Sequence, residues 1–513
     1  MNVAERLVEI LEENGVTHIF GIPGDQIMPM YKALSESSIN HILTKHEQAA
    51  AHAADAFTRT SDTVGVCMAT AAGGALNMVM ATAAAYKDNI PMLILTGDND
   101  LDERDENVFQ SLPLRDVFSN ITQENYSPLN GSEAVFSLKA ALYGLKNNPK
   151  GPIHINLSHD VLMSEDFIDV DLCYLCESDL SSLEDAQKLI SKSKKPLFVL
   201  GAGAISQAEN IKTLADLYQI PITTTFNARG IISEDDPINL GLVGFRATPR
   251  ARKAIEESDC IIALGSIASE RTFQKIDEDK FIHVNINKGM LKGKYQIHGT
   301  VEDVIMNLEF KKVDWLDELL AIDNSITVEG VDDEMKPQAA IKRIMERFED
   351  DIIAADAGSH TTWTTLIYRA KKPNHFLFPG ATAPMGYGLP AAIGASIATG
   401  SRVIVVNGDG DIQMNIQELA TLKENDLDVI VFILNNSEYG IIRQWQEDFY
   451  DMEHYQTDLA NPDFVKLAAA YGIDAVKINT LADLEFLLEK DLKGPLVVEI
   501  NVDKENIPLP NQQ

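Results

Sequence analysis

The residues best suited to chemistry lie at the two ends of the stretch from Asn407 to Asn436. The stretch opens with an aspartate between two glycines, Gly408, Asp409 and Gly410, and closes on two adjacent asparagines. A carboxylate and an amide oxygen are hard ligands, which suit Mg²⁺ or Ca²⁺. The flanking glycines let a ligand approach the backbone closely. These residue types therefore predict a site for a metal ion and an anionic ligand.

The elements around these residues bring the two ends together. RVIVVN and DVIVFIL read as buried strands, and QMNIQELATLKEN between them reads as a helix. In an open parallel sheet, ligands bind outside the carboxyl ends of the strands, and a helix amino terminus attracts phosphate. The stretch lacks a Walker-type lysine, so the metal must neutralise the charge of a diphosphate. A tight turn followed by an ordinary strand end is the simpler interpretation of GDG alone.

Short apolar runs alternate with helical periodicity along the whole chain, which predicts an α/β fold of three doubly wound parallel-sheet domains. The predicted strands are THIFGI, INHILT, VGVCMAT and PMLILTG, then PLFVLGAG, IPITTTF, CIIALGS and FIHVNI, then DIIAAD, RVIVVNGDG, DVIVFILNN and PLVVEINV. The acidic segments 164–185 and 311–335 have no clean period and are expected to be linkers. The predicted domains are therefore 1–165, 186–310 and 336–513.

Composition narrows the class of partner. The 513 residues carry a formal net charge of −34, which disfavours nucleic acid and anionic membranes because both need a basic patch. Four cysteines are too few for a disulfide framework at this length, and Cys173 and Cys176 form only a single CxxC pair. The amino terminus, MNVAERLVEILEENG, reads as an amphipathic helix rather than a secretory signal. No apolar run is long enough to span a membrane. A soluble cytoplasmic protein is expected.

Motifs across nearly the whole chain resemble the thiamine diphosphate (ThDP)-dependent enzymes, most closely the acetolactate synthase large (catalytic) subunit. GDG followed by NN resembles the diphosphate and metal motif of the family. PMGYGLPAAIGA, NNSEYGIIRQWQEDFY and NPDFVKLAAAYG resemble its carboxy-terminal segments, and FGIPGD, KHEQAAAHAADAFTR and GPIHINLSHDV resemble its amino-terminal ones. The likeness is weaker in the middle third. It implies a three-domain architecture of the pyruvate oxidase and acetolactate synthase type.

The resemblance implies ThDP and Mg²⁺ as cofactors. The implied metal ligands are Asp409, Asn436 and the backbone carbonyl of Glu438. The implied cofactor-binding residues are Glu47, Gly74, Asn77, His360, Met385, Gly408, Asp409, Gly410, Asn436 and Glu438. Met385 would hold the two cofactor rings close together, and Glu47 would hydrogen-bond the aminopyrimidine ring. A core methionine and a solvated glutamate are the simpler interpretations of these two residues taken alone.

The resemblance also implies the reaction. The implied catalytic residues are Glu47, Met385, Phe109 and Gln110, and the implied substrate residues are Trp445 and Arg271. Pyruvate would be decarboxylated and its two-carbon unit transferred to pyruvate or 2-oxobutyrate, in branched-chain amino acid biosynthesis. Glu47 would come from one subunit and the metal site from its partner, so a homodimer is expected. A tetramer and a small regulatory subunit are further arrangements that the family allows.

The chain departs from the family pattern at several positions. Ala72 and Gly73 replace a glycine-proline turn, and His159 replaces a lysine. Ile267 stands in place of the first of two arginines, which puts the acceptor substrate in question because a buried carboxylate needs a partner. Asp411 follows GDG where a small residue is usual. We expect its backbone amide to serve the diphosphate while its carboxylate turns to solvent.

Other cofactors and functions stay open. GAGAIS resembles a dinucleotide fingerprint without its third glycine, and NIN stands where flavin-binding relatives usually have DID, so FAD is left undecided. The alternatives to a carboligase are a pyruvate oxidase-like flavin oxidoreductase, a non-oxidative 2-oxo acid decarboxylase and a non-enzymatic ThDP-binding relative. A decarboxylase usually carries paired active-site histidines, and the chain has no adjacent His-His pair.

Overall fold

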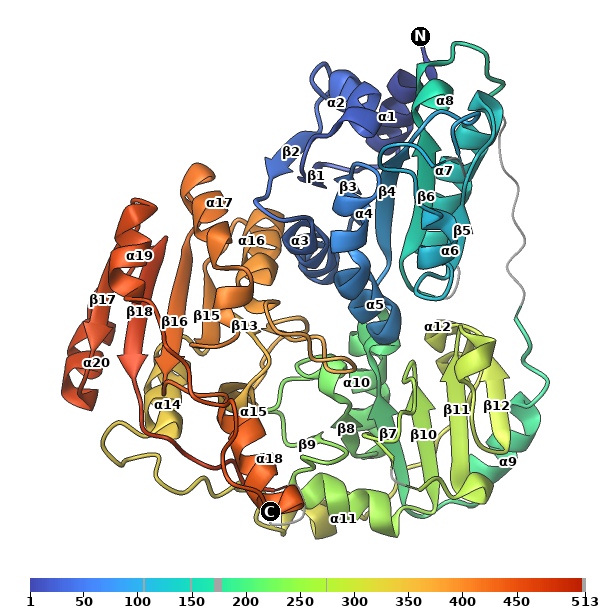
Figure 1. Cartoon of the computed structure of the whole chain (residues 1–513). Coiled ribbons are helices and arrows are strands. Elements are labelled where there is room, and N and C mark those ends of the chain that lie inside the picture. Colours follow the sequence, from blue (N-terminus) through green and yellow to red (C-terminus); the bar gives the residue numbers. More distant parts are fainter. Residues whose placement is uncertain (105–106, 148–149, 170–177, 274, 510–513) are drawn as a thin grey trace.

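The computed structural model describes residues 1–513 except 105–106, 148–149, 170–177, 274 and 510–513. The described residues form three six-stranded sheets, each flanked by helices (Figure 1). Neighbouring strands pair in parallel, as in the register Val403 with Val429. The predicted α/β class is confirmed. The CxxC pair of Cys173 and Cys176 lies outside the described residues.

The amino-terminal sheet has the strand order β2-β1-β3-β4-β6-β5. Its strands are β1 (His18–Gly21), β2 (Asn40–Leu43), β3 (Gly65–Ala69), β4 (Met92–Asp98), β5 (Glu124–Tyr126) and β6 (Ile153–Ser158). Its helices are α1 (Val3–Glu13), α2 (Met28–Leu34), α3 (Glu47–Thr60), α4 (Gly73–Asn77), α5 (Val79–Asp88), α6 (Leu114–Phe118), α7 (Gly131–Asn147) and α8 (His159–Met163).

The central sheet has the order β12-β11-β10-β7-β8-β9. Its strands are β7 (Pro196–Leu200), β8 (Ile222–Thr224), β9 (Asn239–Leu242), β10 (Cys260–Leu264), β11 (Phe281–Asn285) and β12 (Tyr295–His298). Its helices are α9 (Leu183–Lys192), α10 (Ala208–Tyr218), α11 (Pro249–Glu257), α12 (Val301–Ile305) and α13 (Leu316–Leu320).

The carboxy-terminal sheet has the order β14-β13-β15-β16-β18-β17. Its strands are β13 (Ile352–Ala355), β14 (Phe376–Leu377), β15 (Val403–Gly408), β16 (Val429–Asn435), β17 (Asp474–Ile478) and β18 (Leu496–Asn501). Its helices are α14 (Pro337–Arg347), α15 (Ser359–Ile367), α16 (Gly388–Thr399), α17 (Leu419–Glu424), α18 (Gly440–Tyr450), α19 (Phe464–Ala470) and α20 (Leu481–Leu488).

The amino- and carboxy-terminal sheets have the same strand order. The two domains pack against each other through equivalent helices. Helix α3 follows β2, and α16 follows β14, which is the corresponding edge strand. The two helices pack against each other through small residues, and Figure 1 shows them side by side. A Cβ on Gly394 of α16 would lie only 2.0 Å from the carbonyl oxygen of Ala53 on α3. This glycine therefore permits the close approach of the two domains.

Residues 311–335 are not simply a linker. Helix α13 lies within them, and Trp315, Leu316 and Leu319 are buried in the core of the central sheet. The central core thus extends beyond residue 310. The helix is short, and acidic residues surround its few apolar positions, so its periodicity is hard to see in the sequence. None of the helices in the described ranges is long and apolar enough to cross a membrane.

Candidate active site

Strands β15 and β16 bring the two ends of the GDG-to-NN stretch together. They are neighbours in register, with Gly408 opposite Leu434. The backbone N–H of Asp409 donates to the carbonyl of Leu434 at 3.2 Å. Because both strands end at this edge, the loop tips carrying Asp409 and Asn436 converge, as the topology predicted.

The oxygen atoms at these tips suit a hard divalent cation. Asp409 is 2% exposed, and burial raises the pKa of its carboxyl. A bound cation would favour its charged form. Among the residues that the structure describes, no group of three or more His, Cys, Asp or Glu could hold a metal. The predicted set does not need one, since it combines one carboxylate with amide and carbonyl oxygens. Its chemistry therefore fits Mg²⁺.

Asn461 is a site residue that the sequence did not reveal. Its side-chain N–H₂ donates to Oδ2 of Asp409 at 2.5 Å and to Oδ1 of Asn435 at 3.0 Å. It therefore ties the ends of β15 and β16 to each other. The NPDF segment that contains it was quoted only for its resemblance, and its distance in sequence from GDG concealed the contact.

His360 and the neighbouring glycines form a small cradle beside this turn. His360 is 4% exposed at the start of α15, and its Nε2 has no hydrogen-bond partner. Burial lowers the pKa of this imidazole to about 3, so the ring is neutral. A Cβ on Gly358 would lie 2.4 Å from the His360 ring, and one on Gly408 would lie 3.2 Å from it. A buried, unpartnered ring nitrogen next to such glycines fits the predicted role of holding a diphosphate.

The expectation for Asp411 is wrong. Its carboxylate is not turned to solvent but is 3% exposed and points back into the turn. The Gly408 N–H donates to its Oδ2 at 2.9 Å, and the Asn407 amide donates to its Oδ1. Burial, reinforced by the nearby carboxylate of Asp356, raises the pKa of Asp411. The turn itself supplies donors to the side chain, which offsets part of the cost of burial.

Asp356 anchors the loop that carries Met385. Its carboxylate accepts the backbone N–H of Gly386 at 2.9 Å and that of Gly388 at 2.7 Å, and it also accepts the side-chain amide of Asn407 at 3.0 Å. Gly386 has φ +92°, a conformation that favours glycine. Asp356 follows β13 directly and is fully buried. Like the GDG turn, it is an acid at the carboxyl end of a parallel strand, and that position could have identified it.

Glu47 opens α3 and faces two of its predicted neighbours. The amide of Asn77 donates to its Oε2 at 2.9 Å, and a Cβ on Gly74 would lie 3.2 Å from its Oε1. His46 caps the helix by accepting the N–H of Gln48. The structure therefore brings Glu47, Gly74 and Asn77 together.

Glu418, in the carboxy-terminal domain, holds the segment just before Glu47. Its carboxylate accepts the backbone N–H of Lys45 at 2.9 Å and the hydroxyl of Thr421 at 2.7 Å. Glu418 is fully buried, and burial raises the pKa of its carboxyl to about 7. This contact joins the segment before Glu47 to the carboxy-terminal domain within one chain.

Four other predicted residues are not gathered around these groups. Phe109 is 82% exposed, and Gln110 follows it with φ +60°. Trp445 lies on α18 and is 44% exposed. Arg271 is exposed, and its Nη1 lies 3.5 Å from the carbonyl oxygen of Gly380 on the Met385 loop. Within this single chain, Phe109, Trp445 and Arg271 are exposed, and Gln110 is half-buried.

Three of the departures from the family pattern can be described from their local contacts and backbone conformation. Ile267, in place of the first arginine, is half-buried in the loop after β10. His159 lies 3.3 Å from Oδ1 of Asp100 at the start of α8. Ala72 adopts φ +47° just before α4, so the turn is kept without proline.

The loops at the switch point of the central sheet contact each other closely. A Cβ on Gly201, after β7, would lie 2.3 Å from the carbonyl oxygen of Gly265, after β10. Gly203 N–H donates to that same oxygen at 3.0 Å. Asn285, the first residue of NIN, uses its amide to hold the carbonyl of Ser266 at 2.8 Å. The backbone and side-chain groups that a dinucleotide would contact at this sheet edge are hydrogen-bonded to one another.

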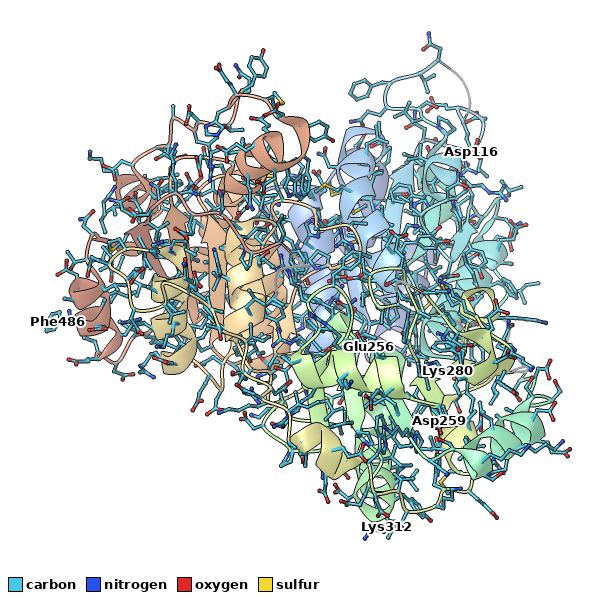
Figure 2. All side chains as sticks on the ribbon, turned by 90° about the horizontal axis from the view of Figure 1, so that it is seen from below. Asp116, Glu256, Asp259, Lys280, Lys312 and Phe486 are labelled. Carbon is cyan, nitrogen blue, oxygen red and sulfur yellow. The ribbon has the colours of Figure 1, made fainter. Side chains whose placement is uncertain are left out.

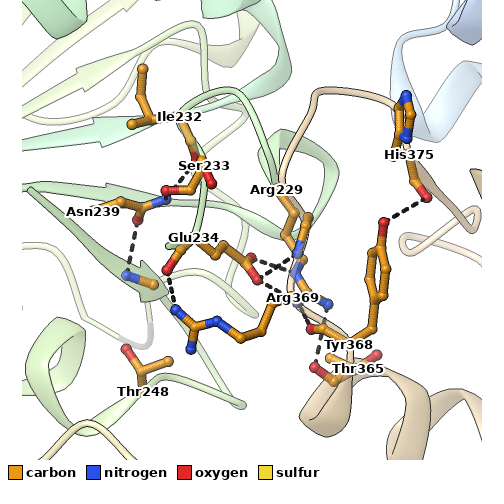
Figure 3. A network of polar contacts seen from close by, with 12 residues as sticks. Arg229, Ile232, Ser233, Glu234, Asn239, Thr248, Thr365, Tyr368, Arg369 and His375 are labelled. Atoms are coloured by element: carbon orange, nitrogen blue, oxygen red, sulfur yellow. Dashed lines mark hydrogen bonds and ion pairs between the residues drawn. The ribbon is translucent and has the colours of Figure 1, made fainter. Parts of the chain in front are cut away.

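A buried ion pair joins the central domain to the end of α15 (Figure 3). Arg229 donates to both carboxylate oxygens of Glu234, at 2.7 and 2.8 Å, and to the carbonyl of Thr365 at 3.3 Å. Glu234 also accepts the N–H of Ala370 at 2.9 Å. A cation at the carboxyl end of a helix satisfies its last carbonyls. Because His360 starts the same helix, the central domain helps to place the cradle.

Another ion pair lies just after β16, at Glu438. The side chain of Glu438 is fully buried, 2.9 Å from Nε of Arg443 and 3.1 Å from Nζ of Lys504. Held this way, the side chain is turned toward α18 and the carboxy-terminal segment. The predicted metal contact of this residue uses only its backbone carbonyl, so the two roles are compatible.

Comparisons with known proteins agree with this geometry. Residues 1–119 match the family model of the thiamine pyrophosphate enzyme N-terminal TPP binding domain, 183–308 that of the central domain, and 356–500 that of the C-terminal TPP binding domain. The chain is 34% identical to a probable acetolactate synthase large subunit of Methanocaldococcus jannaschii, over 98% of this chain and 92% of that protein. It is 31% identical to acetolactate synthase isozyme 1 large subunit of Escherichia coli, over 98% of this chain and 94% of that protein.

Proposed function

Since the chain belongs to the thiamine pyrophosphate enzymes, among the acetolactate synthase large subunits, we propose that it decarboxylates pyruvate and transfers the two-carbon unit to a second 2-oxo acid. The observation that supports this best is the convergence of Asp409 and Asn436 at the ends of β15 and β16. Branched-chain amino acid biosynthesis is the corresponding pathway of the named relatives and the one proposed for this chain.

Residues of the amino-terminal and carboxy-terminal domains would have different roles in the proposed reaction. When bound, ThDP supplies a nucleophilic carbon and an electron sink for decarboxylation. Asp409, Asn436 and the carbonyl of Glu438 would hold Mg²⁺, and the cradle around Gly408, Gly410 and His360 would hold the diphosphate. Glu47 would hold a proton at a ring nitrogen of the aminopyrimidine, and Asn77 orients its carboxylate. Met385 would fix the angle between the rings, and Asp356 anchors its loop.

A second copy of the chain would complete the substrate site. Phe109, Trp445 and Arg271 are exposed, Gln110 is half-buried, and the four are not gathered in one chain. On α18, Ile442, Trp445 and Phe449 are exposed at helical spacing, and an exposed apolar patch of this kind marks a contact surface. A homodimer that brings Phe109 of one copy toward Trp445 of the other would close the pocket over the acceptor. Assembly into a tetramer and a regulatory small subunit remain part of this proposal.

The proposed reaction needs no redox partner. Decarboxylation of one 2-oxo acid and addition to another neither gains nor loses electrons overall, so FAD is not required by the chemistry. Arg271 is the remaining family cation for the acceptor carboxylate, and Ile267 leaves a less polar surface beside it. Pyruvate and 2-oxobutyrate are both proposed as acceptors.

The deciding experiment supplies the purified protein with pyruvate, ThDP and Mg²⁺ and identifies the product. Acetolactate supports the carboligase. Acetaldehyde as the sole product would replace it with a simple decarboxylase, and acetate formed with a bound flavin would replace it with an oxidase. Tight ThDP binding without consumption of any 2-oxo acid would indicate a non-enzymatic relative.

A further inference from the structure

The side chain of Asp411 uses the groups that the cofactor would need. Its carboxylate accepts the Gly408 N–H at 2.9 Å and 3.2 Å, and its Oδ2 lies 3.6 Å from the unpartnered Nε2 of His360. A Cβ on Gly358 would lie 3.5 Å from the same oxygen. The acid therefore lies inside the cradle, between the backbone donor and the histidine.

The side chain of Asp411 turns inward and does not cap the helix that follows. Asp411 precedes a short 3-10 helix, Ile412–Met414, but its own backbone is helical, at φ −77° and ψ −37°, which is not the conformation of a capping residue. Here it makes no capping hydrogen bond. The carboxylate instead turns back three residues, toward Gly408. A small residue at this position would leave the Gly408 N–H and the space next to His360 free.

We propose that Asp411 is an internal competitor of the cofactor diphosphate, whose carboxyl group occupies the cradle and must give up its contacts before ThDP is seated. This inference rests on the proposed function, in which the chain binds ThDP. The diphosphate is itself an acceptor of hydrogen bonds and carries negative charge, so it seeks the same N–H groups and cannot share them with a second acid. The carboxyl groups of Asp356 and Asp411 both accept the side-chain amide of Asn407, so a second acid borders the cradle. Asp411 thus lowers the affinity of this chain for ThDP.

The test compares ThDP affinity in the full-length protein and in two variants, Asp411→Ser and Asp411→Asn. Isothermal titration calorimetry with ThDP at saturating Mg²⁺ gives the dissociation constant without measuring activity. We expect Asp411→Ser to bind about tenfold more tightly, which corresponds to about 1.4 kcal/mol and to roughly one released hydrogen bond. The control is Asp259→Asn, which removes one acid from the central domain (Figure 2) and should leave the dissociation constant unchanged.

The outcomes separate this proposal from the proposed function. Tighter binding by Asp411→Ser supports it, and a smaller gain is expected for Asp411→Asn, because its amide oxygen can still accept the Gly408 N–H. Unchanged or weaker binding by the Ser variant overturns it while leaving the cofactor assignment intact. If far-ultraviolet circular dichroism shows that the Ser variant does not fold, Asp411→Ala, which also empties the cradle, decides by the same criterion. Failure of all these proteins to bind ThDP would overturn the cofactor assignment and this inference together.

Discussion

Replacing Arg229 by methionine should weaken the fold far more than replacing its neighbour Arg369. The Arg229 side chain is 4% exposed and Glu234 is 9% exposed, so the variant leaves an acid buried without its cation. Breaking a buried ion pair in this way costs about 3–5 kcal/mol. Arg369 pairs with Asp235, and these side chains are 59% and 51% exposed. Such a surface pair contributes only about 0–1 kcal/mol.

Urea unfolding of the full-length protein, followed by far-ultraviolet circular dichroism, measures the difference in unfolding free energy. Arg229→Met should lower it by several kcal/mol, and Arg369→Met, the matched control, should lower it by less than about 1 kcal/mol. Adding Glu234→Leu to Arg229→Met should restore part of the loss, because the unpaired acid is then removed. Equal stability of the two arginine variants would refute the view that this pair holds α15 to the central domain.

Three further predictions address the site. Glu47→Gln should lower kcat by about 10²- to 10⁴-fold while changing the ThDP dissociation constant much less, as steady-state kinetics and calorimetry would show; near wild-type turnover would remove Glu47 from catalysis. Asp409→Ala should weaken Mg²⁺ binding by about a hundredfold in a titration at fixed ThDP, and unaltered Mg²⁺ affinity would place the metal elsewhere. Glu418 has a pKa raised from 4.5 to about 7 in the fold, so the folded state binds the extra proton between these values and its contribution to stability falls as pH rises through that window. The difference in urea stability between the wild type and Glu418→Gln should change by up to about 3 kcal/mol from pH 4.5 to pH 7, and a constant difference would contradict the burial of this carboxyl.

Much of the architecture could be read from the sequence because most interior strands of parallel sheets are continuous apolar runs. VIVFIL and VIVV are apolar runs of strand length, so they were predicted as strands. Their carboxyl ends mark the sheet edge where Asp409 and Asn436 lie. Strands β5, β6, β9, β12, β14 and β17 were not among the predicted strands. All of these except β6 lie at sheet edges, where no long apolar run marks them. Strand β6 is interior and fully buried, but polar residues interrupt its sequence, IHINLS.

The site itself was only partly readable. In the structure, Glu47 accepts a hydrogen bond from Asn77, and Gly408 of the GDG turn lies next to the His360 ring. The direction of the Asp411 side chain was not predictable, because its donors lie in its own turn and depend on a side-chain rotamer. Asp356 escaped because it contacts the Met385 loop across 30 residues of sequence, and such contacts leave no periodic pattern.

The shared strand order of the first and last domains means that this chain carries one architectural plan twice. The two versions face each other across the crossing of α3 and α16, where Gly394 and Ala53 nearly touch. The amino-terminal version carries Glu47, and the carboxy-terminal version carries Asp409 and Asn436. A bulky residue at position 394 would force α3 and α16 apart, so it would shift both versions at once.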